Sequence, residues 1–113
     1  MSKKTFSNYL IKKRDDTHLT NSKLANIAQI SAVYLGEIIK NKKKPPDKKT
    51  QYALAKALNL TDREKEEMFN LAAFERGEIP ADVYDYILEN NDLIGEIRNK
   101  RNGKMEKNNG GVV

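Results

Sequence analysis

Apolar residues recur along this chain with the spacing of helices rather than the alternation of strands. Phe6, Tyr9 and Leu10 mark the first such segment, and comparable sets at i, i+3 and i+4 continue along most of the chain. No strand pattern and no internal repeat is found. The pattern therefore predicts an all-α chain, with five helices within residues 5–77 and two more within residues 78–102.

Residues that favour helix N-caps precede four of the predicted helices: Thr20, Ser31, Asp47 and Thr61. Glu64 follows Thr61 by three residues, which is the spacing of a capping box. A capping side chain accepts a hydrogen bond from a free N–H at the start of a helix. These positions therefore predict where the helices begin.

Two short helices on either side of Gln29 are expected to share one small apolar seam. Leu24 and Ala28 fall on one face of the first helix, and Leu35 and Ile38 fall on one face of the second. Neither helix carries enough apolar surface to fold alone, so a tight turn between them predicts a helix-turn-helix. Such a turn often requires a residue with positive φ, which glycine fits best, and Gln29 departs from that ideal.

The outward face of the second helix, over residues 31–40, carries small and charged residues. They are Ala32, Val33, Gly36, Glu37 and Lys40, and Lys42, Lys43 and Lys44 follow directly. A short helix with small outward residues and a cationic exit suits a nucleic-acid groove. A glycine inside a helix costs about 1 kcal/mol relative to alanine. Close approach of the backbone to another surface and a tolerated imperfection are both open explanations for Gly36.

The composition describes one polar domain without cysteine or a membrane segment. Of the 113 residues, 38% are hydrophobic and 33% are charged, and no apolar run approaches the roughly 20 residues that span a bilayer. The N-terminus lacks the apolar core of a signal peptide, so we expect a cytoplasmic protein with no membrane partner. Without cysteine there are no disulfides, thiolate metal sites or thiol catalysis, and we expect neither cofactor nor metal.

The net charge of +5 conceals an asymmetry along the chain. Residues 1–60 hold 13 Lys and Arg against 4 Asp and Glu, whereas residues 61–100 hold 5 against 11. A basic front and an acidic back suggest two surfaces with different partners. Simple variation of surface charge is the alternative explanation.

The stretch LTNSKLANIAQISAVYLGEIIKNKKKPPDKKTQYALAKALNL resembles the helix-turn-helix of the XRE family, of the Cro and phage-repressor type. The resemblance covers residues 5–60, and its marks agree in order and spacing as well as in residue type. They are Leu24-Ala25, Ile30-Ser31, Tyr34-Leu35, Ile38, the basic loop ending in Pro45-Pro46, and Leu54 through Leu60. The stretch from Thr61 through IPADVYDYILEN resembles the C-terminal extension of some small Gram-positive regulators of phages and mobile elements.

The resemblance implies a five-helix Cro/repressor-like domain over residues 5–77, with the second helix of the motif in the major groove. By position it implies DNA contacts for Asn21, Ser31, Ala32, Val33, Glu37, Lys40, Lys42 and Lys43. Asn21 and the lysines would meet phosphates, and the others would lie against base edges or the adjoining backbone. Many members pair an arginine at the position of Arg14 with a glutamate at the position of Ile39. That glutamate is missing here. Arg14 is therefore expected to bind a helix-end carbonyl, Asp15 or a phosphate instead.

These observations predict a sequence-specific DNA-binding transcriptional regulator, a repressor that reads a palindromic operator in double-stranded DNA with residues 31–40. The alternative is an antitoxin or adaptor whose main partner is a protein, bound on the acidic C-terminal half, with DNA binding used for autoregulation. Catalysis is not expected, because His18 is the only histidine and has no second ligand at a useful spacing.

The region after Gly77 is predicted to form a helical extension over residues 78–102, followed by a disordered tail over residues 103–113. Its apolar residues exceed what two short helices can bury on themselves. They are Val83, Tyr86, Ile87, Leu93, Ile94 and Ile97. We expect a homodimer through residues 80–100. The alternative is that these helices fold back onto the first domain and complete one monomeric core.

Overall fold

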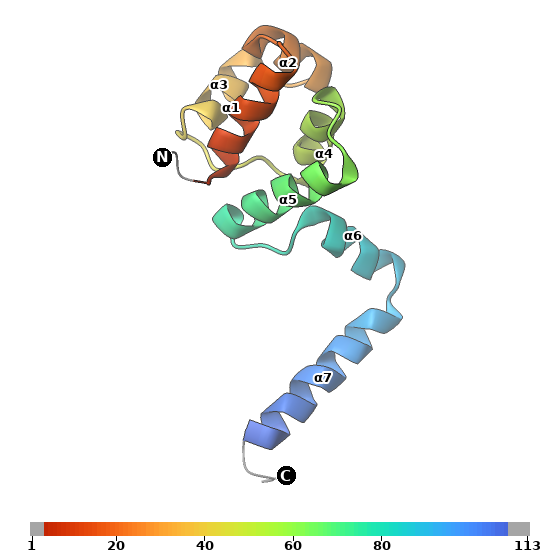
Figure 1. Ribbon diagram of the computed structural model, residues 1–113. Helices are drawn as coiled ribbons and strands as arrows, with labels where there is room; N and C mark the ends of the chain where they lie inside the picture. The colour runs from red at the N-terminus through yellow and green to blue at the C-terminus, as the bar shows by residue number, and fades with distance from the viewer. Residues whose placement is uncertain (1–3, 109–113) are drawn as a thin grey trace. The chain divides into compact units, whose positions relative to one another are not determined.

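The structure, a computed structural model, describes residues 4–108 and is all-helical over that range, with seven helices and no strand (Figure 1). The helices are α1 (Phe6–Asp16), α2 (Asn21–Ala28), α3 (Ala32–Ile39), α4 (Lys48–Ala57), α5 (Asp62–Arg76), α6 (Ala81–Glu89) and α7 (Asp92–Asn108). The chain divides into two compact units between Ala81 and Asp82. The first unit contains α1 to α5, as the prediction of five helices before residue 78 required.

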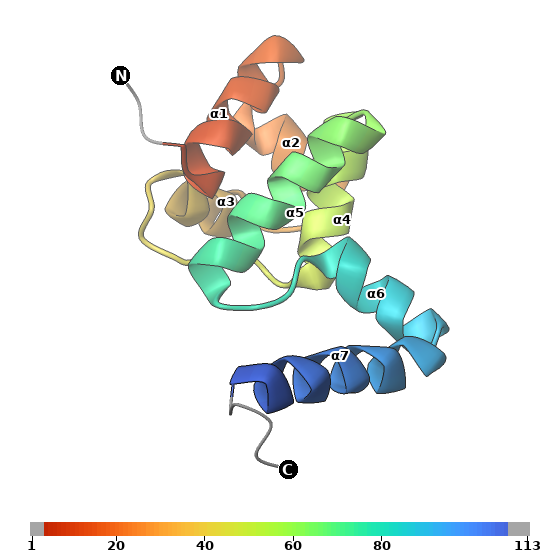
Figure 2. The ribbon, with the colours of Figure 1, turned by 60° about the horizontal axis from the view of Figure 1, so that its bottom comes forward.

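The first unit is built around one core to which all five of its helices contribute. The helix α2 packs against α3 and α4, whereas α1 packs against α3 and α5, and α4 also contacts α5 (Figures 1 and 2). The largest fully buried side chains are Phe6, Leu10, Leu24, Leu35, Ile38, Pro46, Leu54, Leu58, Met68 and Phe69. The spacing of apolar residues therefore identified the core-facing side of each helix.

Side-chain caps fix the first residue of every helix in the first unit. Thr20, Ser31, Asp47 and Thr61 each accept a hydrogen bond from the backbone N–H three residues later, as predicted. Thr5 does the same for α1, with 3.1 Å between its hydroxyl oxygen and the Asn8 nitrogen. These bonds satisfy backbone donors that would otherwise remain unpaired.

The capping box of α5 also connects that helix to α1. The Glu64 carboxylate accepts a hydrogen bond from the Thr61 backbone N–H at 2.8 Å and forms an ion pair with Lys13. The Tyr9 hydroxyl donates to the Glu64 backbone carbonyl at 3.0 Å. The hydrogen bond from Lys13, followed by those from Thr61, lowers the pKa of Glu64 from 4.5 to about 2. One carboxylate therefore closes a helix end and joins two helices.

The second unit differs from the prediction in its limits. Ala81 is buried with the first unit, so the boundary lies a few residues after the predicted one at Gly77. The helix α7 continues to Asn108 and so includes residues 103–108 of the predicted tail. Lys, Met and Glu are good helix formers, and one glycine does not end a helix. The rest of the predicted tail lies outside the described residues.

Substituting Glu64 by glutamine should lower the stability of the fold at neutral pH and flatten its dependence on acid. The pKa of Glu64 lies below its unfolded value, so its ionised form stabilises the fold above pH 4.5, and that contribution is lost as the pH falls towards 2. Glutamine can keep the capping-box hydrogen bond but cannot pair with the charge of Lys13. Denaturant unfolding at a series of pH values measures the effect.

The matched control is Glu66→Gln, a change of the same kind at an exposed position of α5. This variant should keep the wild-type pH dependence between pH 4.5 and 2, the window set by the pKa of Glu64. An unchanged profile in Glu64→Gln would contradict the assignment.

Candidate nucleic-acid interface

The turn between α2 and α3 has the left-handed conformation that the sequence analysis expected. Gln29 adopts φ 60° and ψ 41°, and its N–H bonds to the carbonyls of the last turn of α2. The Ile30 N–H then bonds to the Ala25 carbonyl at 3.0 Å. Gln29 thus occupies a position that favours glycine, and the hydrogen bonds around it hold the turn.

The helix α3 is held by one face and presents the other to solvent. Leu35 and Ile38 are buried in the core, as predicted. Ser31, Ala32 and Val33 are exposed, and 75% of the surface of Val33 is accessible. The remaining outward residues are the half-buried Gly36 and Glu37 and the exposed Lys40. The structure therefore places all the predicted α3 contacts on its solvent-facing side.

Gly36 lies within this face and has no close neighbour. A Cβ atom added to it would meet nothing within 4 Å. Its φ is not in the left-handed region, so the backbone does not require glycine either. Packing within the described part of the first unit therefore does not require glycine at this position. Close approach to a surface outside the first unit and a tolerated imperfection both remain as explanations.

Arg14 finds its partners beside the first turn of α2. Its guanidinium donates to the Asn21 side-chain oxygen at 2.7 Å and pairs with Asp15 at 2.8 Å. Asp15 was one of the three partners that the sequence left open, whereas the contact with Asn21 was not foreseen. Because the Asn21 oxygen accepts from Arg14, its amide N–H₂ group remains available as a donor at the start of α2.

Ile39 stands where many members of the family that the sequence resembles have a glutamate, and its backbone is hydrogen-bonded to α1. The Ser7 hydroxyl donates a hydrogen bond to the Ile39 carbonyl. Ser7 is buried, so this bond satisfies a polar group inside the core and anchors the end of α3. Sequence analysis missed this contact, since nothing in the local pattern connects residues so far apart in the chain.

The lysine loop, residues 42–44, is held at both ends. The N–H groups of Lys42 and Lys43 bond to the Glu37 carbonyl at 2.8 and 3.3 Å, which closes the C-terminus of α3. At the other end, Pro45 and Pro46 are buried. Their carbonyls accept hydrogen bonds from two later helices.

These two hydrogen bonds come from residues to which the sequence analysis assigned no role. The Arg76 guanidinium reaches the Pro45 carbonyl at 2.8 Å, and the Gln51 side chain reaches the Pro46 carbonyl at 2.9 Å. Arg76 also pairs with Glu78 at 2.9 Å, which fixes the guanidinium near the end of α5. Two side chains, one from α5 and one from α4, therefore anchor the end of the loop that follows α3.

The cations around α3 carry uncompensated charge. Lys40 and the three side chains of the lysine loop are exposed, and none of them forms an ion pair with a side chain of residues 4–103. The acids nearest in sequence are Glu37, three residues before Lys40, and Asp47, three residues after Lys44. The Asp47 carboxylate caps α4 by accepting a hydrogen bond from the Thr50 N–H. The result is a mainly cationic rim beside a helix face made of small side chains.

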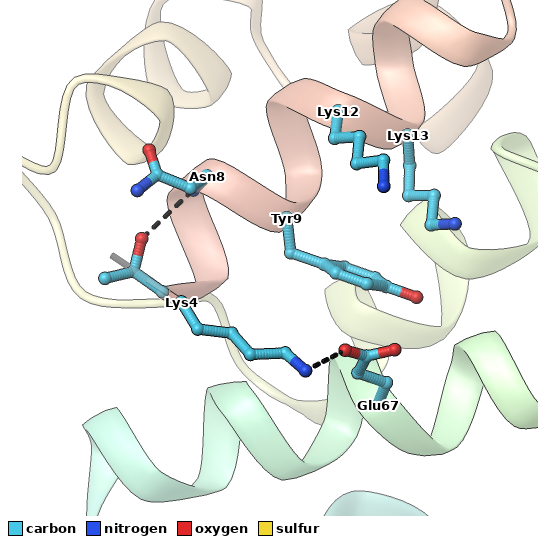
Figure 3. Close-up of a pocket in the computed structure, with 7 residues that line it drawn as sticks. Lys4, Asn8, Tyr9, Lys12, Lys13 and Glu67 are labelled. Atoms are coloured by element: carbon cyan, nitrogen blue, oxygen red, sulfur yellow. Dashed lines mark hydrogen bonds and ion pairs between the residues drawn. The ribbon is translucent and has the colours of Figure 1, made fainter. Parts of the chain in front are cut away.

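A separate hollow of about 290 Å³ lies between α1 and α5 (Figure 3). It is lined by Lys4, Thr5, Asn8, Tyr9, Lys12, Lys13 and Glu67. Lys4 extends to the Glu67 carboxylate at 2.6 Å (Figure 3). Lys13 pairs with Glu64. Burial raises the pKa of the Tyr9 hydroxyl, which keeps it neutral. Of the three lysines in the lining, Lys4 and Lys13 form ion pairs with acids of α5. These ion pairs join α1 and its N-terminal flank to α5, so we interpret the hollow as part of the contact between the two helices.

Acidic and histidine side chains form no metal-binding cluster in the described part of the chain. Among the side chains of residues 4–103, no three of His, Cys, Asp or Glu gather in a way that could hold a metal ion. His18 lies exposed in the turn after α1. None of the described helices is long and apolar enough to cross a membrane.

Comparison of the chain with protein-family models, with curated proteins and with solved structures finds no match. The resemblance described from the sequence therefore rests on the residues quoted for it.

Substituting Gly36 by alanine should raise the free energy of unfolding by about 1 kcal/mol, because alanine loses less backbone entropy in a helix. The new methyl group enters open space. Denaturant unfolding followed by circular dichroism measures the change. The control is Gly77→Ala, which should destabilise the fold because φ at Gly77 is 69°. A destabilised Gly36→Ala variant would show that the fold itself needs this glycine.

Proposed function

We propose that this chain is a sequence-specific regulator of transcription, of the XRE type and acting as a repressor, which binds duplex DNA with α3 in the major groove. The observation that carries the proposal is the solvent-facing side of α3, which combines small side chains with a rim of unpaired lysines. An α-helix is about 10–12 Å in diameter. It therefore fits the major groove, which is about 12 Å wide.

Base reading is assigned to the small and acidic residues of this face. In this proposal Ala32 and Val33 contact the methyl groups of thymine, which are exposed in the major groove. Glu37 accepts a hydrogen bond from a cytosine amino group, or repels phosphates and so rejects a wrong register. Gly36, between them, allows the helix backbone to approach the base edges. Its substitution should therefore improve stability and weaken specific binding.

Backbone contacts are assigned to the residues around this face. The free amide group of Asn21, the hydroxyl of Ser31 and the ammonium groups of Lys40, Lys42 and Lys43 are the candidate donors to phosphate. Such contacts fix the position of a protein on the duplex and supply most of its sequence-independent affinity. Lys44, the last residue of the lysine loop, is also exposed, and we assign it to phosphate as well.

Val33→Asp should abolish sequence preference without affecting folding. Val33 is 75% exposed, so an aspartate there costs little in the core but brings a negative charge against the groove. The measurement is enrichment from a random-sequence duplex pool by the full-length protein, followed by titration of the selected duplex. Asn70→Asp, the same charge change on the exposed side of α5, is the control. Selection that survives in Val33→Asp would show that α3 does not read the bases.

Replacing Lys42, Lys43 and Lys44 by alanine should weaken binding to all duplexes about equally. Each lost phosphate contact should flatten the plot of log K against log salt by about 0.9. Titration of the selected duplex and of a scrambled one at several salt concentrations measures both slopes. An unchanged slope, or a loss confined to the selected duplex, contradicts the assignment of these lysines to phosphates.

We further propose that the protein acts as a homodimer through residues 80–100, because a single helix in the groove contacts too few base pairs to find one site in a genome. Two copies would place their helices about 34 Å apart on a palindrome. Within α6 and α7, Val83, Tyr86, Leu88 and Ile97 remain about half exposed. Such side chains are suited to the contact between two copies.

Light scattering should give the mass of a dimer for the full-length protein, and of a monomer for the double variant Tyr86→Asp/Ile97→Asp. These residues are 59% and 51% exposed, so their substitution leaves the core of the first unit intact. A wild-type protein that is monomeric at tens of micromolar, yet protects a two-fold symmetric footprint, would show that DNA alone pairs the copies.

The second candidate function is that of an antitoxin or adaptor, whose main partner is a protein. The observation in its favour is Phe74 on α5, an aromatic side chain that is 87% exposed within the acidic part of the chain. Failure of the pool selection, together with a host protein whose capture is lost in Phe74→Asp, would favour this candidate over the first.

A further inference from the structure

The second half of α7 is strongly basic. Residues 98–107 hold five Lys and Arg against one Glu, and all of them belong to the helix that runs from Asp92 to Asn108 (Figure 1). Residues 103–107 of this stretch belong to the predicted tail, for which no partner is predicted. Because α7 continues through it, these cations belong to a helix of 17 residues, which is about 25 Å long.

The character of one face of α7 changes halfway along the helix. Leu93, Ile97 and Arg101 follow one another in steps of four residues, so they lie along the same side. The first half of this side is apolar, with Leu93 partly buried and Ile97 half exposed. The next residue on this side is the cationic Arg101, so the described apolar surface suited to a second copy of the chain is interrupted there.

The described cations in this segment are exposed and unpaired. Arg98, Lys100 and Arg101 are exposed, and none of them forms an ion pair with a side chain of residues 4–103. Glu96, one turn before Lys100, is at the spacing of a helical ion pair, but no such pair forms. The charges of these three side chains are therefore available to an external anion.

The helix dipole does not explain these residues. Cations stabilise a helix only within its last turn, where the free carbonyl groups lie. Arg98 and Arg101 are more than one turn from Asn108, the final residue of α7. Three like charges within four positions also repel one another, which opposes the helix rather than supporting it. The segment thus carries a cost that an external partner would offset.

We propose that the second half of α7 binds the phosphates of duplex DNA, as a contact additional to those of α3 and the lysine loop. This inference rests on the proposed function, because it requires that the first unit brings the chain to DNA. Once one unit is bound, the second meets phosphates at a high effective concentration. Even weak contacts then add to the overall affinity.

The chemistry of the segment favours DNA over a protein as its partner. Interfaces between proteins are depleted of charged residues at their centre, whereas this segment is mostly charged. Asn99 and Asn102 lie among the cations and are exposed, and amide groups are common donors to phosphate oxygens. Duplex DNA carries one negative charge per about 1.7 Å of its axis, so it offers several phosphates along a helix of this length.

The test uses the full-length variant Arg98→Gln/Arg101→Gln and a duplex of mixed sequence. Glutamine keeps helix propensity close to that of arginine and removes only the charge. Two lost phosphate contacts should flatten the plot of log K against log salt by about 1.8. Arg98→Lys/Arg101→Lys retains both charges and should keep the wild-type slope.

A matched control removes the same charge elsewhere. Lys56→Gln/Arg63→Gln neutralises two exposed cations of α4 and α5 that lie outside α3 and the lysine loop. Its slope should stay close to that of the wild type. If the two double variants flatten the slope equally, net charge and not the segment determines binding, and the proposal is overturned.

The remaining outcomes separate this proposal from the proposed function. If the wild-type protein binds no duplex, both fail. If it selects a sequence and Val33→Asp loses that selection, while Arg98→Gln/Arg101→Gln keeps the wild-type slope, only the role of α7 fails. If Arg98→Gln/Arg101→Gln becomes monomeric and its slope per bound chain is unchanged, the cations serve a second copy of the chain and not DNA.

Discussion

The burial of one side of α3 is the constraint on which the rest of the first unit depends. A helix of eight residues is too short to be stable alone in water. Leu35 and Ile38 stabilise it by packing into a core shared with α1 and α2. Because these two side chains fix the rotation of the helix, they also decide that Ala32, Val33 and Glu37 point outward. The packing of the core thereby determines which side chains a partner can meet.

Much of this arrangement could be predicted because its signals are local. The caps at Thr20, Ser31, Asp47 and Thr61 act over three residues, and the apolar faces repeat over four. The left-handed turn at Gln29 was expected from the shortness of the connection between two apolar faces. The outward residues of α3 followed from the same periodicity, so most of the candidate site could be placed from the sequence.

The parts that could not be predicted depend on contacts between distant residues. The anchoring of Pro45 by Arg76, and of Ile39 by Ser7, joins segments with no shared pattern. The hydrogen bond from Arg14 to the Asn21 side-chain oxygen likewise joins two helices, and no local pattern announces it. The extent of α7 does not follow from apolar periodicity for another reason. Exposed charged residues can continue a helix without any apolar face, so the end of the apolar pattern does not mark the end of the helix.

The anchoring of the lysine loop has a thermodynamic consequence. Fixing the backbone of one residue costs about 1–2 kcal/mol of conformational entropy. A basic segment that is disordered in the free protein must meet that cost at the moment of binding, and it shows the heat-capacity change of coupled folding. Here the bonds from Arg76 and Gln51 order the end of the loop during folding of the domain itself. An arriving polyanion would then meet lysine side chains on a backbone that is already ordered, and only their flexible methylene stems would lose freedom.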